Sequence, residues 1–223
     1  MADPSVTKHW NNLSGRYQYT MFYTVCMKFP PQQTCDPQAG NQIWSSVSSN
    51  GIEWGAHKML LSSGLGSAEP SAIIDQQADG SFWKVYYADR LNLGVIKMAK
   101  VDGNRNAISA SVVYASNETM TNPEVRFFNG QWHLFFNVYT GSPNGYQLRG
   151  DIKKAIGATN TNFHSAQTII ANSGSPYCAT IGPSITPAGG NTYDLYFGLN
   201  QTQANDICDF TKNISIHRWR MAE

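Results

Sequence analysis

Ala2-Asp3-Pro4-Ser5-Val6, followed by the aromatic segment Tyr17-Gln18-Tyr19-Thr20-Met21-Phe22-Tyr23, is the stretch of sequence that decides the fold. The same pattern occurs four times: a polar or small residue, a proline, a short apolar step and then a strand rich in aromatic residues. The four copies are headed by Asp3-Pro4, Glu69-Pro70, Asn122-Pro123 and Gly182-Pro183. The prolines are 66, 53 and 60 residues apart. A period of this length, built from strands, indicates a repeat architecture.

Each repeat has room for a meander of short strands. Turn sequences such as Asp79-Gly80 and Asn129-Gly130 separate the apolar runs, and helical periodicity is nowhere sustained. Four-stranded antiparallel sheets that recur in this way are typical of β-propeller blades. A sandwich or jelly roll holds as many strands, but it would not explain the recurring proline and aromatic strand.

The sequence therefore predicts an all-β protein, a β-propeller of four-stranded antiparallel blades that forms a single domain over residues 1–223. The expected blades cover residues 3–61, 68–116, 122–172 and 178–223, and the last one lacks its outer strand. Only Met1 and Ala2 precede the first repeat. We therefore expect the ring either to close unconventionally or to be incomplete in this chain.

Composition limits the class of partner. The 223 residues carry a formal net charge of +1, and only 14% of them are charged. Nucleic acids and anionic membranes require a concentrated basic surface, so the balance predicts neither as a partner. The apolar runs are too short to cross a bilayer, which predicts no membrane insertion. Neutral, uncharged partners fit this composition better.

The four cysteines fall into two local pairs, Cys26 with Cys35 and Cys178 with Cys208. Neither pair has a spacing suited to zinc, so disulfides are the favoured interpretation. Disulfides indicate an oxidising compartment. We therefore expect a secreted or otherwise extracytoplasmic protein from which a leader has been removed.

The first repeat also suggests a family. Asp3-Pro4-Ser5-Val6 with its aromatic strand, and the segment Trp44-Ser45-Ser46-Val47-Ser48-Ser49-Asn50-Gly51-Ile52-Glu53-Trp54, resemble the five-bladed propeller glycoside hydrolases, especially the arabinanase and β-xylosidase group called family 43. The resemblance extends over nearly the whole chain. It implies inverting hydrolysis of arabinose- or xylose-type glycans, a glycan or oligosaccharide as partner, and no required cofactor. It also implies that Asp3 is the general base.

Two other positions depart from the pattern of that family. The family has a second Asp, which tunes the pKa of the acid, where this chain has Asn122, and its general acid is a Glu where this chain has Ile181. Isoleucine cannot donate a proton, so hydrolysis requires Glu69 or Glu124, which lie beside repeat prolines, to act as the acid. The candidate catalytic residues are therefore Asp3, Glu69 and Glu124. The alternative is a non-catalytic carbohydrate-binding (lectin-like) protein or a scaffold propeller.

Structural roles compete with these functional ones. An Asp or Glu before a proline often caps a strand or turn through backbone hydrogen bonds. Most tryptophans are expected to pack between blades, and one or two exposed aromatic rings would serve as sugar platforms. His217 is the histidine to inspect for an axial position near a central calcium ion, whose presence the sequence leaves open. The open edge of the last blade suggests self-association.

Overall fold

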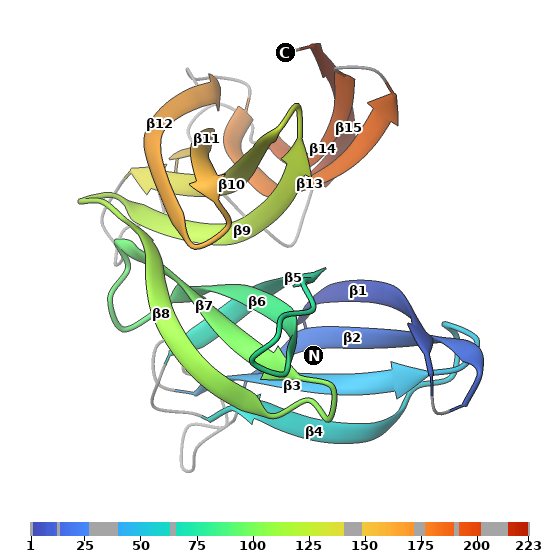
Figure 1. Ribbon diagram of the computed structural model, residues 1–223. Helices are drawn as coiled ribbons and strands as arrows, with labels where there is room; N and C mark the ends of the chain where they lie inside the picture. Colours follow the sequence, from blue (N-terminus) through green and yellow to red (C-terminus); the bar gives the residue numbers. More distant parts are fainter. Residues whose placement is uncertain are drawn as a thin grey trace. The chain divides into compact units, whose positions relative to one another are not determined.

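The computed structural model describes residues 2–12, 14–26, 40–62, 66–140, 149–171, 177–189, 192–201 and 214–222. Within these ranges fifteen strands form four antiparallel sheets, and no helix is present (Figure 1). Three sheets have four strands, and the fourth has three. The prediction of an all-β protein built from β-propeller blades is therefore confirmed, including the shorter last blade. Within the described ranges, the structure offers no helix of the length and apolarity needed to cross a membrane.

Every sheet is a meander in which neighbours in sequence are neighbours in space. The first contains β1 (Ala2–Asn11), β2 (Arg16–Cys26), β3 (Asn41–Ser48) and β4 (Gly55–Leu61), and the second contains β5 (Ser67–Ile74), β6 (Ser81–Asp89), β7 (Val95–Asp102) and β8 (Ala107–Ala115). The third contains β9 (Thr119–Phe128), β10 (Gln131–Thr140), β11 (Arg149–Thr159) and β12 (Asn162–Ile170), and the fourth contains β13 (Tyr177–Gly189), β14 (Thr192–Gln201) and β15 (Ile214–Ala222).

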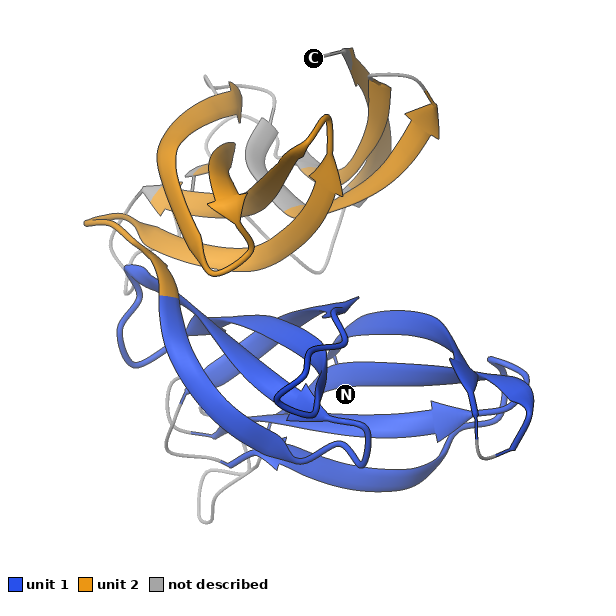
Figure 2. Cartoon of the chain, viewed as in Figure 1, with its two compact units in different colours: residues 1–112 blue, residues 113–223 orange. Residues whose placement is uncertain are grey.

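The chain divides into two compact units, residues 1–112 and residues 113–223 (Figure 2). The first unit holds the first sheet and nearly all of the second, with β8 crossing the boundary. The second unit holds the third and fourth sheets. The single domain over residues 1–223 stays a prediction.

A bulge marks the start of every sheet. The residue before each repeat proline has a positive φ: 51° at Asp3, 58° at Glu69, 50° at Asn122 and 58° at Gly182. The pairing of the first strand with the second shifts register at the same place in all four sheets. Glycine adopts this left-handed conformation freely, Asn and Asp tolerate it, and Glu rarely does. The recurring sequence motif is therefore a β-bulge inside the first strand.

Apolar side chains between the first and second sheets form the core of the first unit. Phe22 and Ile43 of the first sheet are completely buried, as is Val85 of the second. Trp83 packs edge-on against Phe22, and its indole N–H donates to the hydroxyl of Thr7 at 3.2 Å. Burial of each large apolar side chain contributes about 1.5–3 kcal/mol. The expectation that tryptophans pack between blades holds for Trp83.

The second unit repeats this arrangement. Phe135 and Ile152 of the third sheet pack with Ile185, Tyr193 and Leu195 of the fourth, and all five are buried. The rings of Phe135 and Tyr193 meet edge to face at 5.6 Å between centroids. Each pair of adjacent blades within a unit therefore shares one apolar layer, which fixes the first strands of the two blades beside each other.

The edge strand β15 is held by ion pairs as well as by its backbone ladder. Asp194 on β14 accepts two hydrogen bonds from the guanidinium of Arg220, both at 2.9 Å, and Arg218 lies 3.6 Å away. The Arg220 hydrogen bonds lower the pKa of Asp194. Both arginines of this edge therefore pair with a carboxylate of their own sheet, and self-association through the edge stays a prediction.

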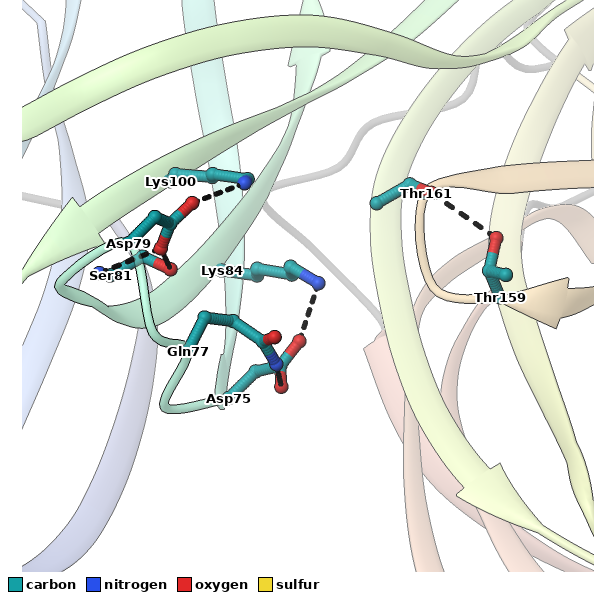
Figure 3. A network of polar contacts seen from close by, with 8 residues as sticks. All are labelled: Asp75, Gln77, Asp79, Ser81, Lys84, Lys100, Thr159 and Thr161. Carbon is teal, nitrogen blue, oxygen red and sulfur yellow. Dashed lines mark hydrogen bonds and ion pairs between the residues drawn. The ribbon is translucent and has the colours of Figure 1, made fainter.

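One predicted turn is built around Asp79. Its carboxylate accepts hydrogen bonds from the Ser81 hydroxyl at 2.6 Å and the Ser81 backbone N–H at 3.0 Å, and it pairs with Lys100 at 2.5 Å (Figure 3). Nearby, Asp75 pairs with Lys84 at 2.5 Å. The Lys100 interaction, followed by the two bonds from Ser81, lowers the pKa of Asp79.

The predicted disulfides are described only in part. Cys26, the last residue of β2, is disulfide-bonded. Its expected partner Cys35 lies outside the described residues, as does Cys208, the expected partner of Cys178. Both pairings therefore stay predictions.

We predict that Gly157→Ala destabilises the β11–β12 hairpin by about 1–3 kcal/mol, since overpacking a tight site costs about that much. A Cβ at position 157 would clash with the carbonyl oxygen of Asn162 and would lie 2.7 Å from that of Thr159. Gly103→Ala is the matched control, because nothing lies within 4 Å of its added Cβ. Urea denaturation of both variants is the measurement, and equal midpoints would contradict the prediction.

We predict that Asp79→Asn lowers the urea midpoint at pH 7 and that the difference from the wild type shrinks at acid pH. A carboxyl group whose pKa is lower in the folded state stabilises the fold above its unfolded pKa, near 3.9, and this contribution is lost as the pH falls through the folded value. The loss should therefore be equal at pH 7 and pH 5 and smaller at pH 2.5. The exposed Glu53→Gln serves as control, and a difference that does not change with pH would refute the assignment.

Candidate functional site

Asp3 lies at the bulge of β1, in the first unit. The residue keeps contact with solvent, but surrounding protein atoms desolvate its carboxyl group, and this burial raises the pKa of Asp3. A hydrogen bond from Thr24 and the positive charges of Arg90 and the α-amino group oppose the rise. A carboxyl group that is reached by water and has a raised pKa is suited to exchanging protons.

Thr24 connects Asp3 to the next blade. It lies on β2, where it faces Ala2 across the ladder, and its side chain is buried. The backbone N–H of Glu69 donates to the Thr24 hydroxyl oxygen at 2.8 Å. Because a hydroxyl has a single proton and this oxygen is already an acceptor, the proton of Thr24 is available for its hydrogen bond to the Asp3 carboxyl.

Glu69 occupies the bulge of β5, the position in the second blade that Asp3 has in the first. It is almost fully buried, and its carboxylate is bonded to the guanidinium of Arg90. Arg90 directly follows β6 and also acts on the charge of Asp3. The structure therefore brings two of the predicted acids, Asp3 and Glu69, together around Thr24 and Arg90.

The second unit has the same arrangement with neutral side chains. Asn137 on β10 faces Thr121 across the ladder, just as Thr24 faces Ala2. Its side-chain oxygen accepts the backbone N–H of Gly182 at 2.8 Å and the amide N–H of Asn122 at 3.4 Å. Asn122 and Gly182 thus stand where the first unit has two acids.

Glu124, the third predicted acid, lies two residues beyond the bulge of β9 in the second unit. This position corresponds to Ser5 in the first blade, whose hydroxyl accepts the backbone N–H of Ala72 in the next blade at 2.9 Å. Glu124 is buried and pairs with Arg126 at 2.5 Å, and Arg126 also donates to the carbonyl of Ile185 in the next blade at 3.3 Å. The pair therefore links adjacent blades, and a catalytic role for Glu124 stays a prediction.

Among the residues that the structure describes, no group of three or more His, Cys, Asp or Glu side chains is arranged to hold a metal ion. His217 lies on the edge strand β15, two strands away from β13, where it hydrogen-bonds to Ser215 at 2.8 Å and stacks on Phe197. An axial place for His217 and a central calcium ion both stay predictions.

Sequence reasoning missed Thr24, Arg90 and Asn137. None of them belongs to the recurring motif, and each becomes relevant only through its contact with a bulge. Thr24 and Asn137 each follow an aromatic run, and Arg90 follows a strand. No sequence pattern marks such positions as part of a site. The exposed pair of Trp10 and Tyr17, with ring centroids 5.2 Å apart, was also missed, and it lies at the opposite end of β1 from Asp3.

No protein-family model and no curated protein sequence matches the chain. Solved structures do match its fold. An exo-1,5-alpha-L-arabinanase from a bovine ruminal metagenomic library is similar with a TM-score of 0.68 at 13% identity, over 99% of this chain and 76% of the arabinanase chain.

Two longer proteins are similar over the same span of this chain. The GH43 protein BlXynB from Bacillus licheniformis has a TM-score of 0.64 at 10% identity and is covered over 42% of its length. The GH32 beta-fructofuranosidase BmSUC1 from Bombyx mori has a TM-score of 0.65 at 11% identity and is covered over 46%. In both cases 99% of this chain is matched, so it spans less than half of either protein. The structural neighbours are thus propellers of the arabinanase and xylosidase type, whereas the described residues here form four blades, not the five that the sequence resemblance implied.

We predict that Glu124→Gln destabilises the second unit by about 1.5–3 kcal/mol, the range of a hydrogen bond to a charged group. The substitution leaves Arg126 without its carboxylate in a largely buried link between two blades. Thermal unfolding of this variant is compared with that of Glu53→Gln, whose side chain is exposed. Equal melting temperatures would show that the Glu124–Arg126 pair contributes no stability.

Proposed function

We propose that this chain is a carbohydrate-active β-propeller of the glycoside hydrolase type, in which Asp3 accepts a proton from the attacking water and Glu69 is the second carboxyl group. The observation that carries the proposal is the placement of Asp3 on a bulge, in contact with solvent, where the single side chain of Thr24 connects it to Glu69 of the next blade. The likeness in fold to an arabinanase and a beta-fructofuranosidase supports a sugar as substrate.

The chemistry requires two carboxyl groups with different tasks. As water attacks the anomeric carbon, its proton passes to the base, and as the glycosidic C–O bond breaks, the leaving oxygen takes a proton from the acid. Asp3 suits the first task because water reaches it and its pKa is raised. Glu69 is proposed for the second task because its backbone N–H bonds to Thr24 and its carboxylate pairs with Arg90, the two residues that also act on the Asp3 carboxyl.

A second candidate function is glycan binding without turnover. Asn122 and Gly182 occupy the two bulges of the second unit, where the first unit has Asp3 and Glu69. Amide groups donate and accept hydrogen bonds without charge, which suits sugar hydroxyls. The family that the sequence resembles also has acidic residues at positions 122 and 181, and this chain has none there.

We predict that the wild-type chain releases sugar from an aryl arabinofuranoside or aryl xyloside and that Asp3→Asn lowers kcat/KM by about 10²–10⁴-fold, the usual contribution of a general base. Glu69→Gln should lower it comparably, and Glu124→Gln should leave kcat unchanged in the folded fraction. Inverted configuration of the released sugar, read by NMR, would support the two-carboxyl mechanism.

The wild type and these three variants also distinguish hydrolysis from glycan binding without turnover. Affinity for an arabino- or xylo-oligosaccharide by calorimetry, without release of reducing sugar, would favour binding alone. An inert wild type that also binds neither glycan would remove both candidates. A loss of activity in Glu124→Gln equal to that in Asp3→Asn would move the acid role from Glu69 to Glu124.

A further inference from the structure

In both units a buried side chain accepts the backbone N–H of a bulge residue, but the side chain is Thr24 in the first unit and Asn137 in the second. In each, the N–H of the bulge residue in the second blade donates to a side chain on the second strand of the first blade: Glu69 to Thr24 at 2.8 Å, and Gly182 to Asn137 at 2.8 Å. In each, that same side chain also contacts the bulge residue of its own blade, Asp3 or Asn122. Both receiving side chains are buried, with exposed fractions of 5% at Thr24 and 0% at Asn137.

The receiving side chain makes two hydrogen bonds, and its chemistry decides the direction of the second one, to the bulge residue of its own blade. A backbone N–H can only donate, so the receiving atom has to be an acceptor in both units. A hydroxyl oxygen that accepts in this way keeps a proton to donate, and Thr24 directs it to the carboxyl of Asp3. An amide oxygen has no proton, so Asn137 can only accept from its second neighbour, and Asn122 supplies an N–H.

We propose that Thr24 is a positioning residue for Asp3. We also propose that the side-chain oxygen of Asn137 makes a neutral side chain at position 122 more stable than a charged one. The residue on the second strand thus decides whether the bulge beside it can hold a negative charge. The consequence for catalysis rests on the proposed function, whereas the charge matching itself is a property of the folded chain. It also accounts for the different residues at two equivalent bulges, Asp3 and Asn122.

A carboxylate at position 122 would meet the wrong group. Its oxygen would face the side-chain oxygen of Asn137 in a buried place, where two acceptors repel each other and no hydrogen bond joins them. Rotating the Asn137 amide would turn its NH₂ group toward the N–H of Gly182, leaving two donors opposed. A hydroxyl at position 137 removes the conflict, because it can accept from Gly182 and donate to the carboxylate.

Among the residues that the structure describes, the charge that acts on Asp3 is that of Arg90, which follows β6 and pairs with Glu69 on β5, and the α-amino group adds a second positive charge. On β2 the neighbouring group is the uncharged Thr24. Removal of the Thr24 hydroxyl therefore changes one hydrogen bond to the carboxyl and no formal charge.

The first arm of the test measures the titration of Asp3 directly. The carboxyl ¹³C resonance, assigned by its loss in Asp3→Asn, is followed against pH in the wild type, Thr24→Val and Thr24→Ser. We expect the midpoint to move to higher pH in Thr24→Val, because a hydrogen bond to the charged form is lost, and to stay in place in Thr24→Ser. Equal midpoints in the wild type and Thr24→Val would overturn the proposal.

Where the chain hydrolyses a sugar, the acid limb of its pH–rate profile should move with this midpoint in Thr24→Val, while KM stays unchanged. An inert chain whose Asp3 midpoint still moves would refute the proposed function and retain the positioning role. An active chain whose pH–rate profile and Asp3 midpoint do not move in Thr24→Val would support the proposed function and refute the positioning role of Thr24.

The second arm does not depend on Thr24 and remains informative if Thr24→Val fails to fold. Asn122→Asp should lower the melting temperature at pH 7 and recover it at pH 3, because a protonated carboxyl group can donate to Asn137 and the penalty grows only above the unfolded pKa. Asn122→Asp combined with Asn137→Thr should regain most of the loss at pH 7. A double variant no more stable than Asn122→Asp, or a single variant as stable as the wild type at both pH values, would overturn the proposal.

Discussion

The left-handed backbone before each repeat proline is the constraint on which the rest of the structure depends. Four residues adopt it at equivalent places, with φ between 50° and 58°. For a residue other than glycine such a conformation costs on the order of 1–3 kcal/mol unless the surroundings enforce it. Two things enforce it here: the proline, which fixes the next φ, and the apolar layer that each pair of blades shares. Asp3, Glu69 and Asn122 are held in this way on the first strands of their blades.

The bulge also connects neighbouring blades. By interrupting the ladder it frees one N–H from strand pairing, and that N–H finds its partner in the preceding blade, at Thr24 for Glu69 and at Asn137 for Gly182. A buried N–H without such a partner would destabilise the fold. The strain at the bulge and the contact between the blades are therefore two aspects of one arrangement, and the candidate site arises where this arrangement meets a charged side chain.

The sequence predicted the blades, because the recurring Asp-Pro and Glu-Pro steps are local signals that survive folding. It also predicted that Asp3, Glu69 and Glu124 line one cavity, whereas the contacts within the first unit connect Asp3 and Glu69 through Thr24 and Arg90. It did not reveal that the motif is a bulge, since positive φ at Glu69 is not a preference of that residue. It grouped Glu124 with Asp3 and Glu69 because all three stand beside a proline, whereas Glu124 follows its proline and pairs with Arg126. Thr24, Arg90 and Asn137 depend on contacts between strands far apart in the chain, which no local pattern contains.

Fold likeness and site chemistry carry different weight for this chain. Identities of 10–13% with an arabinanase, a GH43 protein and a beta-fructofuranosidase show how the backbone is arranged, and one such backbone hosts many chemistries. What distinguishes the two units of this chain is charge, since one has carboxylates at its bulges and the other has an amide and a glycine. An arginine compensates Glu69, and a hydroxyl donates to Asp3. A carboxyl group that a donor of this kind holds in contact with solvent suits proton transfer, which is why the proposed function places its chemistry in the first unit.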